Sequence, residues 1–127
     1  MKKEISALLV LAALLAAALL NIHCICGLTD ELTALSEASA HAAQMENWAE
    51  AEQYAEKAVR QWEASEGYTH IVLRHAEIDA VSDSLYEMME RMAAGENADE
   101  AVAASQMAIY HLKSISGMER IRLGSIF

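Results

Sequence analysis

An uninterrupted apolar run near the N-terminus constrains the fold of this chain more than any other feature. Between Ile5 and Ile22 the only polar residues are Ser6 and Asn21. Since each residue of an α-helix adds ~1.5 Å, this run extends about 27 Å as a helix. With the apolar residues that follow, it can cross a hydrocarbon core about 30 Å thick. We therefore predict a transmembrane helix over residues 5–26.

The charges that flank the apolar run predict its orientation. Lys2 and Lys3 precede it and Asp30 follows it, and basic residues are retained on the cytoplasmic side of a membrane. We therefore expect residues 1–4 in the cytoplasm and residues 27–127 in an extracytoplasmic domain, with a single pass through the cell membrane. The alternative is a cleaved signal peptide. Because the apolar region of a signal peptide has about 7 to 15 residues and this run is longer, we favour an uncleaved signal anchor.

Small residues recur along the predicted membrane helix. Ala13 and Ala17 are four residues apart, so they share one face of the helix and let a second membrane helix approach closely. The competing interpretation is that alanine is simply tolerated in a segment of Ala and Leu. Ala13 and Ala17 are thus candidate interaction residues, for self-association or for contact with another membrane protein.

The rest of the chain has the composition of a helical protein. It contains no proline and many Ala, Leu, Glu and Met residues, which lose little conformational entropy in helices. Apolar periodicity predicts four helices: the membrane helix continued to about Met45, one from Asn47 to Gly67, one from Thr69 to Ala94, and one that begins at Asn97. Short connections make successive helices antiparallel neighbours. We predict an all-α fold in which the transmembrane helix continues into an antiparallel three- or four-helix bundle.

Local signals support these helix boundaries. Asn47 and Asn97 each precede a glutamate by three residues, which is the pattern of a capping box at a helix start. Gly67 and Gly95 are the expected helix stops, because glycine readily takes the left-handed conformation that ends a helix.

Side chains at helical spacing on two successive helices predict the core of the bundle. It combines two large rings, three small side chains and two aliphatic side chains of the following helix: Trp48, Ala51, Ala55, Ala58, Trp62, Ile78 and Leu85. Rings at both ends and methyl groups between them predict an opposing helix that packs closely at the middle. We expect both tryptophans to be largely buried. The same periodicity places Ile71 and His75 on the buried face of the third predicted helix.

The charge of the chain limits its partners. The formal net charge is -10 at pH 7, and such a surface repels nucleic-acid phosphates. It also argues against a second contact with anionic lipid, beyond the membrane helix itself. We expect no nucleic-acid partner.

One group of side chains is a weak candidate for metal binding. His75, Asp79 and Asp83 are spaced by four residues and line one face of a helix. An imidazole with two carboxylates can hold a divalent metal, but two turns of one helix rarely complete a coordination shell. We favour a polar layer on the bundle and predict no metal and no cofactor.

The two cysteines stand close to a histidine at the end of the apolar run. On a helix, Cys24 and Cys26 point about 200° apart and cannot share one ion. We interpret them as apolar residues at the membrane interface.

Four features occur in a distinctive order. They are Trp48-x-x-Ala51, Trp62 fourteen positions after Trp48, His75-x-x-Ile78-Asp79, and the terminal Ile126-Phe127. In this the chain resembles the domain-of-unknown-function 4363 family over nearly its whole length. The resemblance implies a short bacterial protein with an N-terminal membrane helix, a helical remainder and a multi-span membrane protein as partner; it implies no activity. The chain departs from the family pattern at Gly124-Ser125, where we expect an Asn beside the terminal pair.

The sequence offers little catalytic chemistry. It contains no nucleophile–base pair, phosphate-binding loop or zinc-ligand spacing that we recognise, and a bundle of this size barely fills its own core. We expect no enzyme and no catalytic residue. Our first hypothesis is a non-enzymatic interaction or accessory module for another membrane protein, with Ile126 and Phe127 as candidate contacts. The alternative is an extracytoplasmic sensor that binds a cation or small ligand through its acidic surface.

Overall fold

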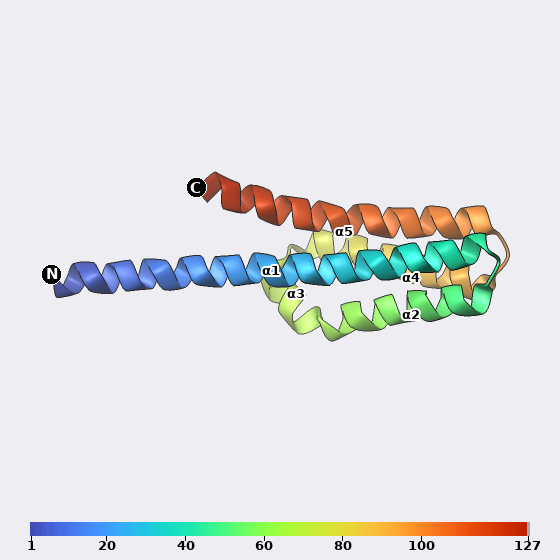
Figure 1. Ribbon diagram of the computed structural model, residues 1–127, viewed down its shortest axis with the longest axis horizontal. Coiled ribbons are helices and arrows are strands. Elements are labelled where there is room, and N and C mark those ends of the chain that lie inside the picture. The colour runs from blue at the N-terminus through green and yellow to red at the C-terminus, as the bar shows by residue number, and fades with distance from the viewer. Residues whose placement is uncertain (127) are drawn as a thin grey trace.

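Five helices make up the part of the chain that the structure describes. The computed structural model describes the backbone of residues 1–126 and the side chains of residues 1–117. The helices are α1 (Lys2–Gln44), α2 (Trp48–Ala64), α3 (Glu66–Val72), α4 (His75–Ala94) and α5 (Ala98–Ile126). The predicted all-α class is confirmed. Figure 1 shows that α1 projects far beyond the other helices at its N-terminal end and that α5 returns alongside it.

The four long helices form a closed antiparallel bundle. α1 packs against α2 and α5, and α4 packs against the same two helices. Each long helix therefore has two neighbours, and the short α3 connects α2 to α4 at the end from which α1 projects (Figure 1). The prediction of a three- or four-helix bundle is confirmed in its four-helix form.

Small and hydroxylated side chains let α1 approach its neighbours closely. The buried face of α1 begins at Ile25 and contains Leu32, Ser39 and Ala42. The Ser39 hydroxyl donates a 2.7 Å hydrogen bond to the backbone oxygen of Ala51 in α2. A hydroxyl can be buried here because its hydrogen bond is satisfied.

Asparagine side chains start α2 and α5, as predicted. Asn47 Oδ1 accepts from the Glu50 backbone N–H at 3.4 Å, and Asn97 Oδ1 accepts from the backbone N–H groups of Asp99 and Glu100 at 3.0 and 3.2 Å. These bonds satisfy donors that have no partner inside the helix. The glutamates do not complete a capping box, because the Glu50 carboxylate accepts from the Asn47 side-chain amide instead.

The predicted third helix is wrong as a single element. Leu73 and Arg74 are extended, at φ/ψ of -109/157° and -74/148°, and they separate α3 from α4. Thr69 and Leu73, on either side of the end of α3, are buried, while Ile71 between them is exposed. Gly67 is not a helix stop but lies within α3. Gly95 does end α4, at φ 61° and ψ 30°.

The predicted core seam lies inside the bundle, apart from one end. Ala51, Ala55, Ala58, Trp62, Ile78 and Leu85 are all buried. Trp48 is partly buried and packs against this core, so it is less enclosed than Trp62. It lies at the end of the bundle against Gly95, where a Cβ would come within 3.2 Å of Trp48 Cγ.

Candidate functional site

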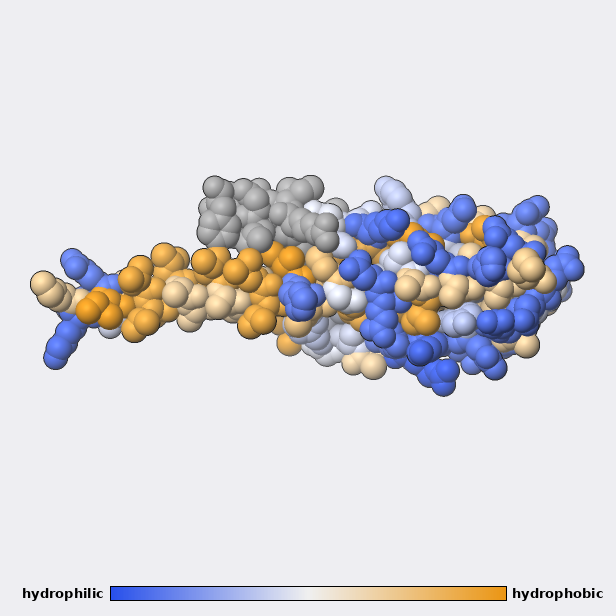
Figure 2. Space-filling view, in the orientation of Figure 1, coloured by the Kyte–Doolittle hydropathy of each residue, from blue (hydrophilic) through white to orange (hydrophobic). Residues whose placement is uncertain are grey.

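The feature of this fold with the clearest functional meaning is the projecting part of α1. Nine large hydrophobic side chains between residues 5 and 20 are 37–67% exposed. One helix of the described chain, α1, is long and apolar enough to cross a membrane, and none of its most apolar stretch is buried in the bundle. In Figure 2 this projection is almost entirely hydrophobic, whereas hydrophilic residues gather over the bundle.

Hydrogen bonds link α1 to α3 and to α5 where the projection joins the bundle, and we call this group of polar contacts the collar. The Tyr68 hydroxyl from α3 donates hydrogen bonds to the backbone oxygen of Asn21, at 3.3 Å, and to its side-chain oxygen. Two turns further along α1, the hydroxyls of Thr29 and Ser116 lie 3.2 Å apart and link α1 to α5. The first burial of an α1 side chain, at Ile25, falls between these two links. The collar therefore marks where an exposed apolar helix becomes a packed one.

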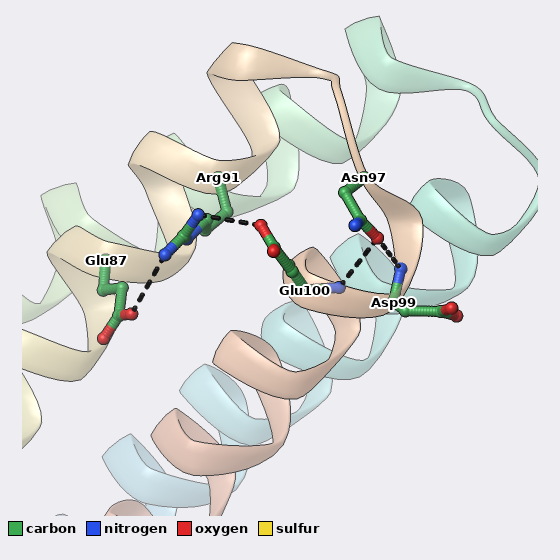
Figure 3. A network of polar contacts seen from close by, with 5 residues as sticks. All are labelled: Glu87, Arg91, Asn97, Asp99 and Glu100. Carbon is green, nitrogen blue, oxygen red and sulfur yellow. Dashed lines mark hydrogen bonds and ion pairs between the residues drawn. The ribbon is translucent and has the colours of Figure 1, made fainter.

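The opposite end of the bundle carries a network of charged side chains, shown in Figure 3. Arg91 of α4 lies 2.9 Å from Glu100 of α5 and 3.9 Å from Glu87 in its own helix. All three side chains are about half exposed, so solvent screens these ion pairs and each stabilises the fold only slightly. The Glu100 carboxylate binds Arg91 instead of closing the predicted capping box. The network joins α4 to α5 and leaves the surrounding surface acidic.

A tyrosine–carboxylate pair crosses from α4 to α2. The Tyr86 hydroxyl donates a hydrogen bond to a Glu63 carboxylate oxygen. This bond raises the pKa of Tyr86, because it favours the protonated phenol; slight burial and the negative charges of Glu63 and Glu66 act in the same direction. The pair is a surface contact, since both side chains are exposed.

The weak metal candidates do not form a cluster. His75, Asp79 and Asp83 are all exposed on the outer face of α4, and His75 is not on a buried seam as the periodicity suggested. Its ring lies edge-on to His70 of α3, with centroids 6.2 Å apart. Among the described residues no group of three His, Cys, Asp or Glu side chains is placed to hold a metal ion. Asp83 lines an open depression together with Tyr86, Arg91 and two glutamates.

The remaining candidates lie on or near the projection. Ala13 and Ala17 are exposed on α1. Cys24 is exposed, Cys26 is partly buried, and both are free thiols. The candidate contacts Ile126 and Phe127 lie outside the described side chains.

Sequence reasoning missed the collar. Tyr68 fell between two predicted helices and was given no role, and Ile71, on the same side of α3, was expected on a buried face. The available signal was Asn21, a polar residue in the last turn of an apolar run, but nothing in a linear sequence pairs it with a tyrosine 47 positions away.

Fold and surface together define a small all-helical protein with a bare apolar helix continuous with an acidic four-helix bundle. A family model described as Domain of unknown function (DUF4363) matches residues 19–126. The chain belongs to this family, and the resemblance seen in its motifs is confirmed. No curated protein and no solved structure is matched by the chain.

Proposed function

We propose that this protein is a membrane-anchored, non-enzymatic interaction module. In this proposal α1 spans the cell membrane with residues 1–4 in the cytoplasm, and the acidic bundle lies outside and contacts another membrane protein. The observation that carries the proposal is the bare apolar projection of α1. It extends from a bundle whose surface is rich in charged side chains.

The energetics of the projection favour a membrane around it. Removing a large aliphatic side chain from water is worth about 1.5–3 kcal/mol. Nine such side chains, each 37–67% exposed, together represent a free energy comparable with the whole stability of a small domain, ~5–15 kcal/mol. A chain that left them in water would forgo this free energy or would aggregate through them.

The continuity of α1 supports an interaction role for the bundle. A single helix runs from Lys2 to Gln44, so it spans about 65 Å at ~1.5 Å per residue without a break. A partner that contacts the membrane part of α1 is thereby held at a fixed position relative to the bundle. Ala13 and Ala17, exposed on one face of α1, are suited to close contact with a partner helix.

Affinity purification of the full chain in mild detergent tests the proposal. We expect a membrane protein to co-purify in fixed stoichiometry. Replacing both small residues, Ala13→Leu with Ala17→Leu, should release the partner because the helices can no longer approach closely. The matched control, Leu11→Ala with Leu15→Ala, changes side-chain volume about 200° around the helix and should retain it. A chain that purifies alone under all conditions would contradict an interaction role.

The same preparation tests the signal-peptide alternative. An uncleaved anchor keeps residues 1–4, whereas cleavage gives a mature N-terminus near Gly27 and a released bundle. Mass spectrometry of the intact protein distinguishes the two.

The alternative function, a sensor for a cation, depends on the exposed face of α4. We expect elemental analysis of the full chain to find no stoichiometric metal. We also expect His75→Ala to change the unfolding free energy by less than about 0.5 kcal/mol, as for most exposed positions. A bound ion that the variant loses would favour the sensor over the interaction module.

A further inference from the structure

An unusually exposed isoleucine lies in the short helix α3. Ile71 is 83% exposed, more than any other large hydrophobic side chain described after residue 20. This exposure does not mean that α3 is detached from the bundle, because the nearby residues Thr69 and Leu73 are buried. The helix therefore turns one side to the bundle and presents Ile71 on the other. A single exposed aliphatic residue is ordinary on a soluble protein, so its position decides what it means.

Hydrogen bonds to α1 fix the position of α3 along the axis of α1. Tyr68, three residues before Ile71, is bound through its hydroxyl to both oxygens of Asn21. Asn21 stands in the last turn of the apolar run, and the first buried side chain of α1 follows at Ile25. α3 is thus held where the bare apolar surface of α1 ends, at the end of the bundle from which α1 projects (Figure 1).

One side of α3 has the chemistry of a membrane interface, although Glu66 at the start of the helix is exposed and acidic. Tyrosine is enriched at the boundary between hydrocarbon and headgroups, where its ring lies in lipid and its hydroxyl is hydrogen-bonded. Ile71 supplies an aliphatic side chain on the same side of the helix, since residues three apart are neighbours. The carboxylates of the network around Arg91 lie at the other end of the bundle.

We propose that α3 is a second membrane contact, in which Tyr68 and Ile71 enter the interfacial layer of the outer leaflet beside the anchoring helix. This inference rests on the proposed membrane span of α1. The contact is apolar rather than ionic, so it requires only zwitterionic lipid and is compatible with the net charge of -10. It would fix the tilt of the bundle against the membrane, because two points of attachment replace one.

Site-directed spin labelling of the full chain in phosphatidylcholine vesicles tests the contact. The native thiols are removed by Cys24→Ser and Cys26→Ser, and one cysteine is introduced for a nitroxide label. Ile71→Cys reports on α3, and its high exposure means that the substitution leaves the core unchanged. Collisions of the label with oxygen, which concentrates in lipid, are compared with collisions with a water-soluble nickel chelate.

Two control positions bracket the expected result. Leu14→Cys, at a 63% exposed site, lies in the middle of the apolar run, and Met45→Cys, at a 70% exposed site, lies at the far end of the bundle. We expect the ratio of oxygen to nickel collisions to be highest at residue 14, intermediate at residue 71 and lowest at residue 45.

Each other outcome overturns a definite part of the proposal. A label at residue 71 that matches residue 45, while residue 14 is in lipid, shows that α3 faces water although α1 is anchored. A label at residue 71 shielded from both oxygen and nickel shows that protein, such as a second copy of the chain, covers α3. A label at residue 14 that collides freely with nickel shows that the membrane anchor itself is wrong.

Discussion

Removal of the Trp62 side chain should destabilise the bundle more than any other single truncation in α2. Trp62 is 2% exposed, and its indole N–H donates a 2.8 Å hydrogen bond to the Ser82 hydroxyl of α4. Truncating a buried Trp to Ala is destabilising by about 3–5 kcal/mol, through lost transfer free energy and the cavity left behind. Ser82 is only partly buried, so water can replace its lost partner and adds little to this figure. Because a small domain has only ~5–15 kcal/mol in total, Trp62→Ala should leave a marginal fold.

Thermal unfolding of the full chain in detergent, followed by circular dichroism, measures the effect. One kcal/mol shifts the melting temperature of a domain of this size by about 4–8 °C, so Trp62→Ala should lower it by at least about 12 °C. Trp62→Phe keeps most of the ring and should lose about 1 kcal/mol with the hydrogen bond. Trp48→Ala, at the partly buried end of the seam, should be milder than Trp62→Ala. An unchanged melting curve for Trp62→Ala would refute the assignment of this face of α2 to the core.

Three further predictions concern packing, backbone geometry and pH. Ala55→Leu should destabilise the bundle by ~1–3 kcal/mol in chemical denaturation, because Ala55 is fully buried and the space is filled. Gly95→Ala should destabilise by roughly 1–2 kcal/mol, since Gly95 has φ +61° and alanine is disfavoured there; a neutral result would mean that the turn relaxes. Ultraviolet titration should give Tyr86 a pKa above its ordinary value of 10.0, and Glu63→Ala should bring it down. Since the raised pKa favours the protonated phenol, its contribution to stability is present below about pH 10 and is lost as pH rises through the pKa of the folded state.

The sequence predicted the fold class and most helix ends for physical reasons that are local. Asn47, Asn97 and Gly95 act on the backbone within one turn, so their effects are readable from neighbouring residues. The apolar run is equally local, because its length alone makes it a candidate membrane helix.

The break between α3 and α4 could not be predicted in the same way. Neither Leu73 nor Arg74 is a helix breaker by type, and no proline or glycine marks the position. Leu73 is buried although its backbone is extended, so its conformation goes with its packing in the folded bundle and not with its residue type. Tertiary packing thus overrides local helix propensity.

The buried face of α5 could be predicted only in part. Apolar spacing along this helix marks Ser105, Leu112 and Ile115, which are buried, but also Val102 and Ile109, which are only partly buried. The centre of the buried face is occupied by Ala101, Ala104 and Ala108. Alanine is common on any helix surface, so a buried alanine stripe gives little sequence signal, although here it allows the helices to pack closely.

The direct test of the central proposal, a bundle held outside the cell by a spanning α1, is thiol labelling in intact cells. With Cys24→Ser and Cys26→Ser as background, Met45→Cys places one thiol at the far end of the bundle, at a 70% exposed site. A membrane-impermeant maleimide should label it in intact cells, whereas Glu4→Cys should react only after the membrane is permeabilised. Labelling of Met45→Cys only after permeabilisation, or labelling of Glu4→Cys in intact cells, would contradict the proposed topology.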